Sequence, residues 1–252
     1  MRIDLNADVG ESLGLWPMGD DAALIPLVSS VNIACGFHAG DPRTIERTVA
    51  LAVASGAAIG AHPGYPDLVG FGRRDMAMAP DDLEAAIVYQ VGAVAAFARA
   101  AGSGLVHVKA HGALYNRAAR DPATAEAIVR ATRRVSGELI VVGPGGSVLE
   151  AAAVSAGSPW AAEAFPDRAY EADGSLRSRR LADALVLDPG TAAERAVRMV
   201  RDGEVIAVDG STLRVSPATL CLHGDAPGAP VRVAALRRAF AEAGIEVRAL
   251  GG

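Results

Sequence analysis

Two carboxylates stand close together near the start of the chain, in the run from Leu5 to Ser12. Asp8 ends an apolar run and Glu11 follows it across a glycine, so both could face one cavity. Paired carboxylates serve as acid and base groups or as ligands for a divalent cation. We predict that Asp8 and Glu11 are catalytic, and a local capping role in the loop is the alternative for Glu11.

A lysine and a histidine two residues apart form a second candidate pair. Lys109 and His111 alternate with apolar residues, and side chains two apart in a strand share a face. A buried lysine beside carboxylates can stay charged and stabilise negative charge that develops on a substrate. We predict that both are catalytic. For Lys109 the alternative is an ion pair with an aspartate that holds the fold together.

Two more histidines stand in glycine-containing runs, His38 in Cys-Gly-Phe-His-Ala-Gly and His62 in Gly-Ala-His-Pro-Gly. Glycine lets the backbone approach a ligand closely. A Gly/Pro-rich segment then leads to Arg73 and Arg74, and its composition predicts a long loop that could act as a lid. Guanidinium groups there suit a carboxylate or a phosphate, although one of the two could be a plain surface charge.

The remaining candidates lie at the ends of other apolar runs. Glu163 precedes a loop that is rich in cations, and His223-Gly224-Asp225 ends the last strand-like run. The residues that we assign to substrate binding are Asn6, His38, His62, Arg73, Arg74, Glu163, Arg168, His223 and Asp225.

Polar and apolar residues alternate along three of these runs, 2–8, 105–111 and 219–224. An antiparallel sheet with one hydrated face is the alternative explanation. Helical segments intervene, however, so we expect a parallel sheet covered by helices, with the polar faces converging inside a barrel. Unpaired buried charges would cost several kcal/mol each, so these groups must pair with each other, a metal or a ligand. Most of them stand at the carboxyl ends of strands, where barrels place their active sites.

The elements that must position these residues alternate along the whole chain. The strand candidates are 2–8, 29–36, 57–62, 105–111, 139–143, 160–165 and 219–224. The helix candidates are 42–55, 81–101, 122–136, 146–156, 190–202 and 231–243. This order predicts an α/β fold of parallel β/α units in a single domain over residues 1–252. Seven strands would close an irregular (β/α) barrel.

Local signals refine this plan. Three Asp-Pro pairs, beginning at Asp41, Asp121 and Asp188, predict helix starts, because aspartate caps backbone N–H groups and proline at the first position loses no hydrogen bond. Residues 204–217 differ, because two β-rich stretches flank an Asp-Gly pair. That pattern predicts a hairpin inserted into the barrel.

Composition and charge exclude some classes of function. The chain carries 24 basic and 29 acidic residues, without the clustered basic excess of a nucleic-acid or membrane-surface binder. Two cysteines make a disulfide framework unexpected and indicate a reducing compartment. We find no signal-peptide pattern and no uncharged apolar span of about 18 residues, so a cytoplasmic protein is expected.

The glycine-rich run 143–147 lacks the lysine of a phosphate-binding loop, and neither a nucleophile elbow nor a Cys-x-x-Cys pair is found. If the reaction uses ATP, we expect another chain to bind it.

Taken together, five runs resemble the LamB/YcsF family: 6–11, 32–41, 60–74, 109–116 and 223–225. The resemblance covers nearly the whole chain. It implies a seven-stranded barrel similar to the polysaccharide deacetylases of the glycoside hydrolase/deacetylase superfamily. It also implies a role as the A subunit of the bacterial 5-oxoprolinase, which with the B and C subunits opens 5-oxoproline (pyroglutamate) to L-glutamate with ATP hydrolysis.

The sequence departs from the family pattern at three places. Ala110 replaces the proline of a Lys-Pro-His run, and Ala7 replaces a cysteine before Asp8. Arg179 matches a family arginine, but residues 180–183 replace a Ser-x-Pro-Gly stretch.

The implied mechanism uses ATP to activate the lactam carbonyl oxygen, after which water attacks the phosphorylated lactam or its equivalent. Asp8 or His111 would be the general base, Lys109 would stabilise the oxyanion, and the loop arginines would hold a carboxylate or phosphate.

Two rival hypotheses remain open. In the first, the chain is a metal-dependent amide or polysaccharide deacetylase in which Asp8, His38 and His62 bind a divalent cation. In the second, it is a non-catalytic lactam-utilisation subunit that shapes a partner's site.

Overall fold

The computed structural model describes residues 1–224 and 228–252. Within these residues seven parallel strands close a barrel, because the last strand pairs back with the first. In order around the barrel they are β1 (Arg2–Val9), β2 (Ser30–Ala34), β3 (Ala58–His62), β4 (Leu105–Lys109), β5 (Ile140–Pro144), β6 (Trp160–Ala164) and β9 (Thr219–His223). The predicted irregular seven-stranded (β/α) barrel is confirmed.

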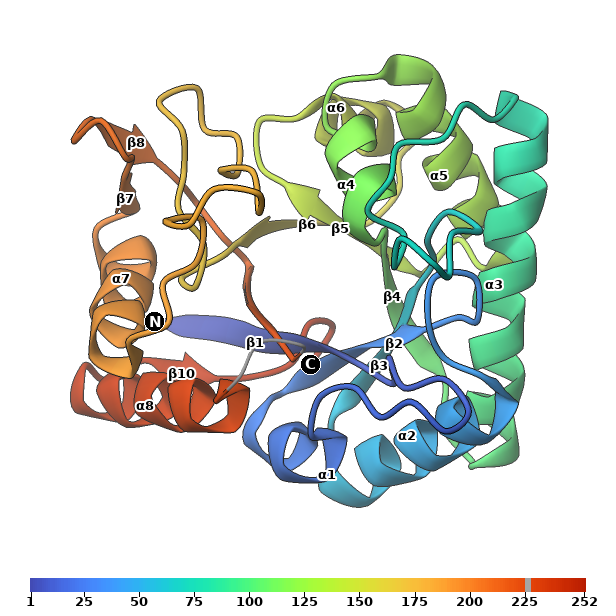
Figure 1. Ribbon diagram of the computed structural model, residues 1–252, viewed down its shortest axis with the longest axis horizontal. Coiled ribbons are helices and arrows are strands. Elements are labelled where there is room, and N and C mark those ends of the chain that lie inside the picture. The colour runs from blue at the N-terminus through green and yellow to red at the C-terminus, as the bar shows by residue number, and fades with distance from the viewer. Residues whose placement is uncertain (225–227) are drawn as a thin grey trace.

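Helices surround this barrel on the outside (Figure 1). They are α2 (Pro42–Ser55), α3 (Pro80–Ala100), α4 (Gly112–Ala118), α5 (Pro122–Val135), α6 (Val148–Ser155), α7 (Pro189–Arg201) and α8 (Ala229–Glu242). The short α1 (Asp21–Leu24) and the 3-10 turn η1 (Ile25–Leu27) precede β2.

The alternation in β1 shows why the barrel has a polar interior. Leu5 and Ala7 are fully buried against the helical layer, while Asn6 and Asp8 from the opposite face are buried inside. Neighbouring strands continue this pattern, because Asp8 pairs in register with Asn32 of β2 and His223 of β9. Side chains far apart in sequence therefore meet within the barrel.

The predicted helix starts are confirmed at all three Asp-Pro pairs. The Asp41 carboxylate accepts hydrogen bonds from the backbone N–H groups of Arg43 and Thr44. Asp121 and Asp188 each accept one from the backbone N–H three residues later. These caps fix where α2, α5 and α7 begin.

The short elements α4 and β10 (Glu246–Val247) were not predicted from the sequence. α4 occupies part of a segment that carries the lysine–histidine motif, and β10 adds two residues beside the start of β1. Neither is long enough to show a hydrophobic period. In the segment 204–217, where the sequence predicted a hairpin, β7 (Glu204–Ile206) and β8 (Thr212–Arg214) pair antiparallel, apart from the barrel sheet.

By length and composition alone, α3 is apolar enough to cross a membrane, which we did not expect from the sequence. In this fold it packs against α5 and the outside of β3 and β4. Its side chains Leu83, Ile87, Val91 and Val94 are buried in that contact, which accounts for its apolar character.

Candidate active site

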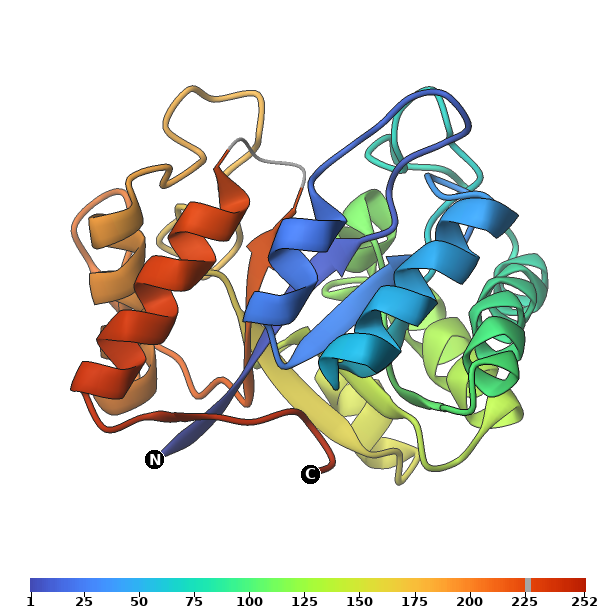
Figure 2. The same ribbon diagram turned by 90° about the horizontal axis from the view of Figure 1, so that it is seen from below.

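The predicted site residues that the structure describes gather at the carboxyl end of the barrel. The loops 10–20, 63–79 and 165–188 project from this end, and the two chain termini lie at the opposite end (Figure 2). The polar groups form two layers. A deep network lies between the strands, and a mouth cluster lies at and just beyond the strand ends.

Lys109 is the centre of the deep network, which we define as Asn6, Asp8, Asn32, Lys109, Glu163 and Cys221. Its ammonium Nζ donates to Asp8 Oδ1 and to Cys221 Sγ, both at 2.9 Å, and lies 3.0 Å from Glu163 Oε1. These contacts occupy the three N–H donors of a lysine. They favour the ion-pair alternative for Lys109 over direct contact with a substrate oxyanion.

Amide side chains extend the network. Asn32 Nδ2 donates to Asp8 Oδ1 at 2.8 Å and to Asn6 Oδ1 at 2.6 Å, and Asn6 Nδ2 donates to Glu163 Oε1 at 3.0 Å. Asn32 Oδ1 lies 2.7 Å from Nε2 of the buried His107. The His107 ring occupies the space beside Gly60, where an added Cβ would come within 2.0 Å of it. Gly60 is therefore required by the packing of this histidine.

Charges in the network support one another. Burial by itself would raise the pKa of Asp8, but His62 and Lys109 hold it well below its ordinary value. Burial would likewise lower the pKa of Lys109, but Asp8 and Glu163 raise it well above its ordinary value. Both groups are therefore ionised at neutral pH.

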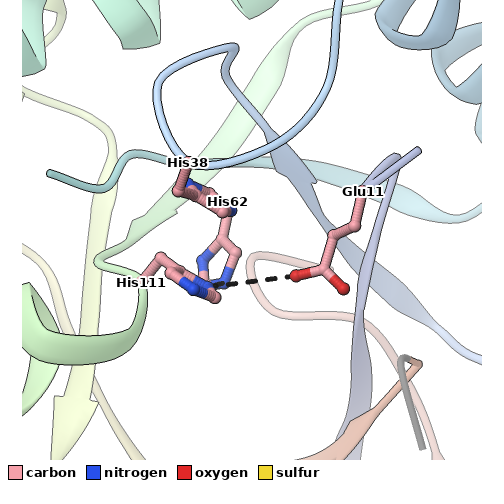
Figure 3. Close-up of side chains that lie close together, drawn as sticks. All are labelled: Glu11, His38, His62 and His111. Carbon is pink, nitrogen blue, oxygen red and sulfur yellow. Dashed lines mark hydrogen bonds and ion pairs between the residues drawn. The ribbon is translucent and has the colours of Figure 1, made fainter. Parts of the chain in front are cut away.

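The mouth cluster consists of Glu11, His38, His62 and His111, four buried residues from four different segments (Figure 3). One potential ligand atom from each lies within 4.8 Å of all the others. Glu11 faces the histidines from the loop after β1, with its Oε1 3.9 Å from His111 Nδ1. A group of three imidazoles and one carboxylate could hold a divalent cation.

The histidine rings are held in fixed orientations. His62 Nδ1 lies 2.7 Å from the Lys109 carbonyl oxygen, and His111 Nε2 lies 2.8 Å from the Phe71 carbonyl oxygen. The His38 ring stacks on His111 with centroids 3.7 Å apart and planes 2° from parallel. Both ring nitrogens of His38 are buried and have no hydrogen-bond partner among the described residues.

The loop 63–79 covers this cluster, as the sequence predicted for a long loop over the site. Phe71 adopts a left-handed backbone conformation with φ 53°, which is uncommon for a bulky residue and directs its carbonyl group to His111. Gly72 follows with φ 63°, and a Cβ there would come within 2.7 Å of His38. Strained backbone of this kind often occurs at functional sites.

Burial keeps the outer histidines neutral. It lowers the pKa of His38 well below its ordinary value, and the neighbouring His62 and Arg73 lower it further. Burial also lowers the pKa of His111 well below its ordinary value, with His38 and His62 adding to the shift. Both imidazoles can therefore accept a proton at neutral pH without first losing one.

The three predicted arginines have different surroundings. Arg73 lies with its Cζ 4.7 Å from the centre of the Phe71 ring, next to the cluster. Arg74 is 65% exposed at its side chain and is paired with Asp67. Arg168 is buried and donates to the carbonyl oxygens of residues 177 and 184, so its contacts organise the loop 165–188.

His223 lies on the β9 side of the site, where its Nδ1 is 3.0 Å from Asp167 Oδ2 and its ring stacks on Phe165. Asp225, the last predicted substrate-binding residue, lies outside the described residues. The predicted metal set of Asp8, His38 and His62 shares only its histidines with the mouth cluster, although Asp8 Oδ2 is 3.4 Å from His62 Nε2.

Three residues with central contacts were not selected from the sequence: Asn32, Asp167 and Cys221. Asn32 and Cys221 could have been found from strand alternation, because both share the inward face with selected residues. Asp167 lies in a loop, where no periodic signal marks its contact with His223.

Comparison with known proteins places the chain among relatives. The model of the LamB/YcsF family matches residues 3–252. A protein of Methylococcus capsulatus, named as the A subunit of 5-oxoprolinase, is 54% identical over 250 residues, which cover 99% of this chain and 96% of that protein. One of the same name from Thermus thermophilus is 51% identical, covering 99% of this chain and 100% of that one.

Two solved structures are similar to this chain. A lactam utilization protein from Thermus thermophilus superposes with a TM-score of 0.94 at 50% identity, covering 99% of this chain and 100% of that one. A protein from Enterococcus faecalis superposes with a TM-score of 0.54 at 13% identity, covering 98% of this chain and 96% of that one. The second likeness is one of fold alone.

Proposed function

The chain belongs to the LamB/YcsF family, and on that premise we propose that it acts as the A subunit of an ATP-dependent 5-oxoprolinase. In this proposal it opens 5-oxo-L-proline to L-glutamate together with the B and C subunits. The observation that carries the proposal is the match, at 54% and 51% identity over nearly full length, to proteins named as this component of 5-oxoprolinase. The buried mouth cluster, at the end of the barrel where such folds carry their sites, supports it.

An unstrained lactam is a resonance-stabilised amide, which resists attack by water. Transfer of a phosphoryl group from ATP to the carbonyl oxygen would make the carbonyl carbon a better electrophile and provide a leaving group. One water molecule would then attack that carbon, and opening of the C–N bond would leave an acyl phosphate on the new glutamate. A second water molecule would hydrolyse this acyl phosphate and release phosphate. We assign the hydrolytic part of this sequence to the carboxyl end of the barrel.

Within the site, we favour His38 as the group that accepts the proton from water. Asp8 Oδ1 is already engaged by Lys109 and Asn32. His111 has one ring nitrogen on a backbone carbonyl, whereas neither ring nitrogen of His38 has a hydrogen-bond partner among the described residues. A positioned imidazole of this kind suits general base catalysis.

Arg73 is the cation that we assign to the substrate carboxylate or phosphate, because it adjoins the mouth cluster. Arg74 contacts Asp67 and Arg168 contacts backbone carbonyl oxygens, so both would act through the loops that these contacts organise. Lys109 would keep Asp8 ionised beside His62, so that its effect on the reaction is electrostatic.

ATP is proposed to bind to the partner subunits, because the glycine-rich run 143–147 lacks a phosphate-binding lysine. A turn closed by hydrogen bonds between Leu13 and Trp16 exposes Leu15 and Trp16, at 95% and 73%. Val69, on another loop at the same end, is 92% exposed. We expect the partner subunits to cover these apolar side chains, in the cytoplasm where ATP is available.

The proposal is tested by assaying every combination of the three subunits for glutamate release and ATP turnover. The complete set should produce glutamate from 5-oxoproline only when ATP is present, and the isolated chain should not hydrolyse ATP. Robust ATPase activity of the isolated chain would contradict this division of labour. Trp16→Ser should weaken assembly without changing the unfolding of the isolated chain, and unchanged assembly would contradict the proposed contact surface.

A further inference from the structure

Two histidines in the mouth cluster face each other in a way that neutral rings alone do not explain. His62 Nδ1 and His111 Nε2 each lie against a backbone carbonyl oxygen, at 2.7 and 2.8 Å. A carbonyl only accepts, so both of these nitrogens carry the ring hydrogen. In neutral rings the other two nitrogens, His62 Nε2 and His111 Nδ1, then present lone pairs to each other at 3.0 Å.

Carboxylate oxygens approach the same pair of nitrogens. Glu11 Oε1 lies 3.9 Å from His111 Nδ1, and Asp8 Oδ2 lies 3.4 Å from His62 Nε2. If one of the two rings carried an extra proton, that proton could form a hydrogen bond in only one of the three contacts among His62, His111 and the two carboxylates. A divalent cation could be shared among several acceptors at once, and this convergence of lone pairs is what such a site requires.

We propose that Glu11, His62 and His111 bind a divalent metal ion of the zinc type, with Asp8 Oδ2 next to the site. Ligand atoms about 2.1 Å from a common ion lie about 3.4 Å apart in a tetrahedron. The separations of 3.0 and 3.9 Å between the ligand atoms fall on either side of this value. Imidazole and carboxylate ligands suit zinc and related ions, and the two carbonyl groups fix the tautomers that coordination needs.

His38 stands outside this set, although it belongs to the mouth cluster. Its ring is parallel to that of His111 at 3.7 Å, and the lone pair of a ring nitrogen lies in the plane of the ring (Figure 3). An ion in the plane of the His111 ring therefore lies out of the plane of the His38 ring by about the distance between the two stacked rings. His38 could bind the same ion only by leaving the stack, so we assign it no ligand role.

The catalytic role of the ion rests on the proposed function, whereas the binding of the ion does not. A cation at this place would polarise a substrate carbonyl or lower the pKa of a water molecule. His38, adjacent to the site and without a hydrogen-bond partner among the described residues, would then take the proton.

The test is metal binding by the full-length chain. The protein is stripped with a chelator and titrated with Co²⁺ and Zn²⁺, and binding is measured by the visible Co²⁺ spectrum and by elemental analysis after desalting. We expect about one ion to bind per chain. Zn²⁺ should displace bound Co²⁺ when both are present. Affinity should fall by at least about 10- to 100-fold in His62→Ala, His111→Ala and Glu11→Gln.

The matched control is the remaining histidine of the cluster. His38→Asn, with His38→Ala as a second variant, should keep the ion and the shape of the Co²⁺ spectrum. Circular dichroism of each variant shows whether lost binding reflects lost folding. Wild-type protein without saturable metal binding would overturn the inference. It would also be overturned if a folded His38 variant lost the ion while a folded His111→Ala variant kept it.

The same samples separate this inference from the proposed function. Saturable binding by a chain whose complex releases no glutamate would refute the function and leave the metal site standing. Glutamate release at full rate by a complex that binds no ion would refute the site and leave the function standing.

Discussion

The deep network and the mouth cluster are adjacent in one barrel, but their polar groups are satisfied in different ways. In the deep network, the single ammonium group of Lys109 lies at hydrogen-bonding distance from the carboxylates of both Asp8 and Glu163. In the mouth cluster, His62 Nε2 and His111 Nδ1 lie 3.0 Å apart, and neither nitrogen of His38 has a hydrogen-bond partner among the described residues. Buried polar residues are therefore a weak sign of function until their partners are counted.

Asp8 connects the two regions. Its Oδ1 accepts from Lys109 and Asn32 in the deep network, and its Oδ2 faces His62 in the mouth cluster. The comparison predicts that substitutions on the network side mainly lower stability, because they leave buried charges unpaired. Those on the cluster side should mainly lower activity, because active-site groups are often neutral or unfavourable for folding.

The largest effect is expected for the mouth cluster. His38→Ala and His111→Ala should each reduce glutamate release by the assembled complex by roughly 100- to 10,000-fold, the usual contribution of a positioned catalytic group. The free energy of unfolding, measured with urea, should change little. The matched control is His107→Gln in the buried layer below, which should reduce stability rather than the turnover of folded enzyme. Full activity of the His111→Ala variant would contradict the assignment of catalysis to the mouth cluster and of stability to the deep network.

The next effect concerns the deep network. Lys109→Met leaves two buried carboxylates without their cation, so the free energy of unfolding should fall by about 3–5 kcal/mol. Urea unfolding of the isolated chain measures this. Adding Glu163→Gln removes one of the two uncompensated charges and should recover part of the loss. If Lys109→Met is as stable as the wild type but inactive, Lys109 acts on the substrate and the ion-pair interpretation is wrong.

A smaller effect separates the two arginines on the loop 63–79. Arg73→Ala should raise the apparent KM and cost about 1.5–3 kcal/mol in kcat/KM, the value of a lost charge-assisted contact. Arg74→Ala should have a weaker effect, because its guanidinium group is already paired with Asp67. Steady-state kinetics with 5-oxoproline compare the two. Equal KM values for wild type and both variants would show that this loop does not hold the substrate anion.

The smallest effect tests two helix caps of the same type. Asp41→Ala should lower stability by about 1 kcal/mol, and Asp188→Ala should also lower it, because each removes a helix cap. Only Asp41→Ala should also alter activity, because its carboxylate holds the backbone N–H of Gly14 in the loop after β1. An Asp188→Ala variant with the same loss of activity would contradict this.

The pH dependence of the Asp41 cap follows from the same contacts. Hydrogen bonds, from the Gly14 backbone first and then from Thr44, lower its pKa to about 2. The carboxylate is therefore more acidic in the folded chain than in the unfolded chain. Its contribution should be complete above about pH 4 and disappear as the pH falls through about 2. A wild-type minus Asp41→Ala difference in unfolding free energy that does not shrink on acidification would contradict the cap.

The sequence by itself determined the local features of this protein. Alternation in β1 identified Asn6 and Asp8 as inward residues, and the order of apolar runs predicted the seven barrel strands. Asp-Pro pairs located three helix starts. These features follow from neighbours within one or two turns of the chain, so a single sequence contains the information.

Only the tertiary structure decided which inward groups meet. Lys109 finds Asp8 across 101 positions and Cys221 across 112, and these contacts depend on how the barrel closes between β1 and β9. His38 follows β2 and His111 follows β4, and the barrel order, which sets these strands on either side of β3, allows their rings to stack. Periodicity states which face a residue occupies, but its partners on that face are set by strand register and closure, which no local pattern encodes.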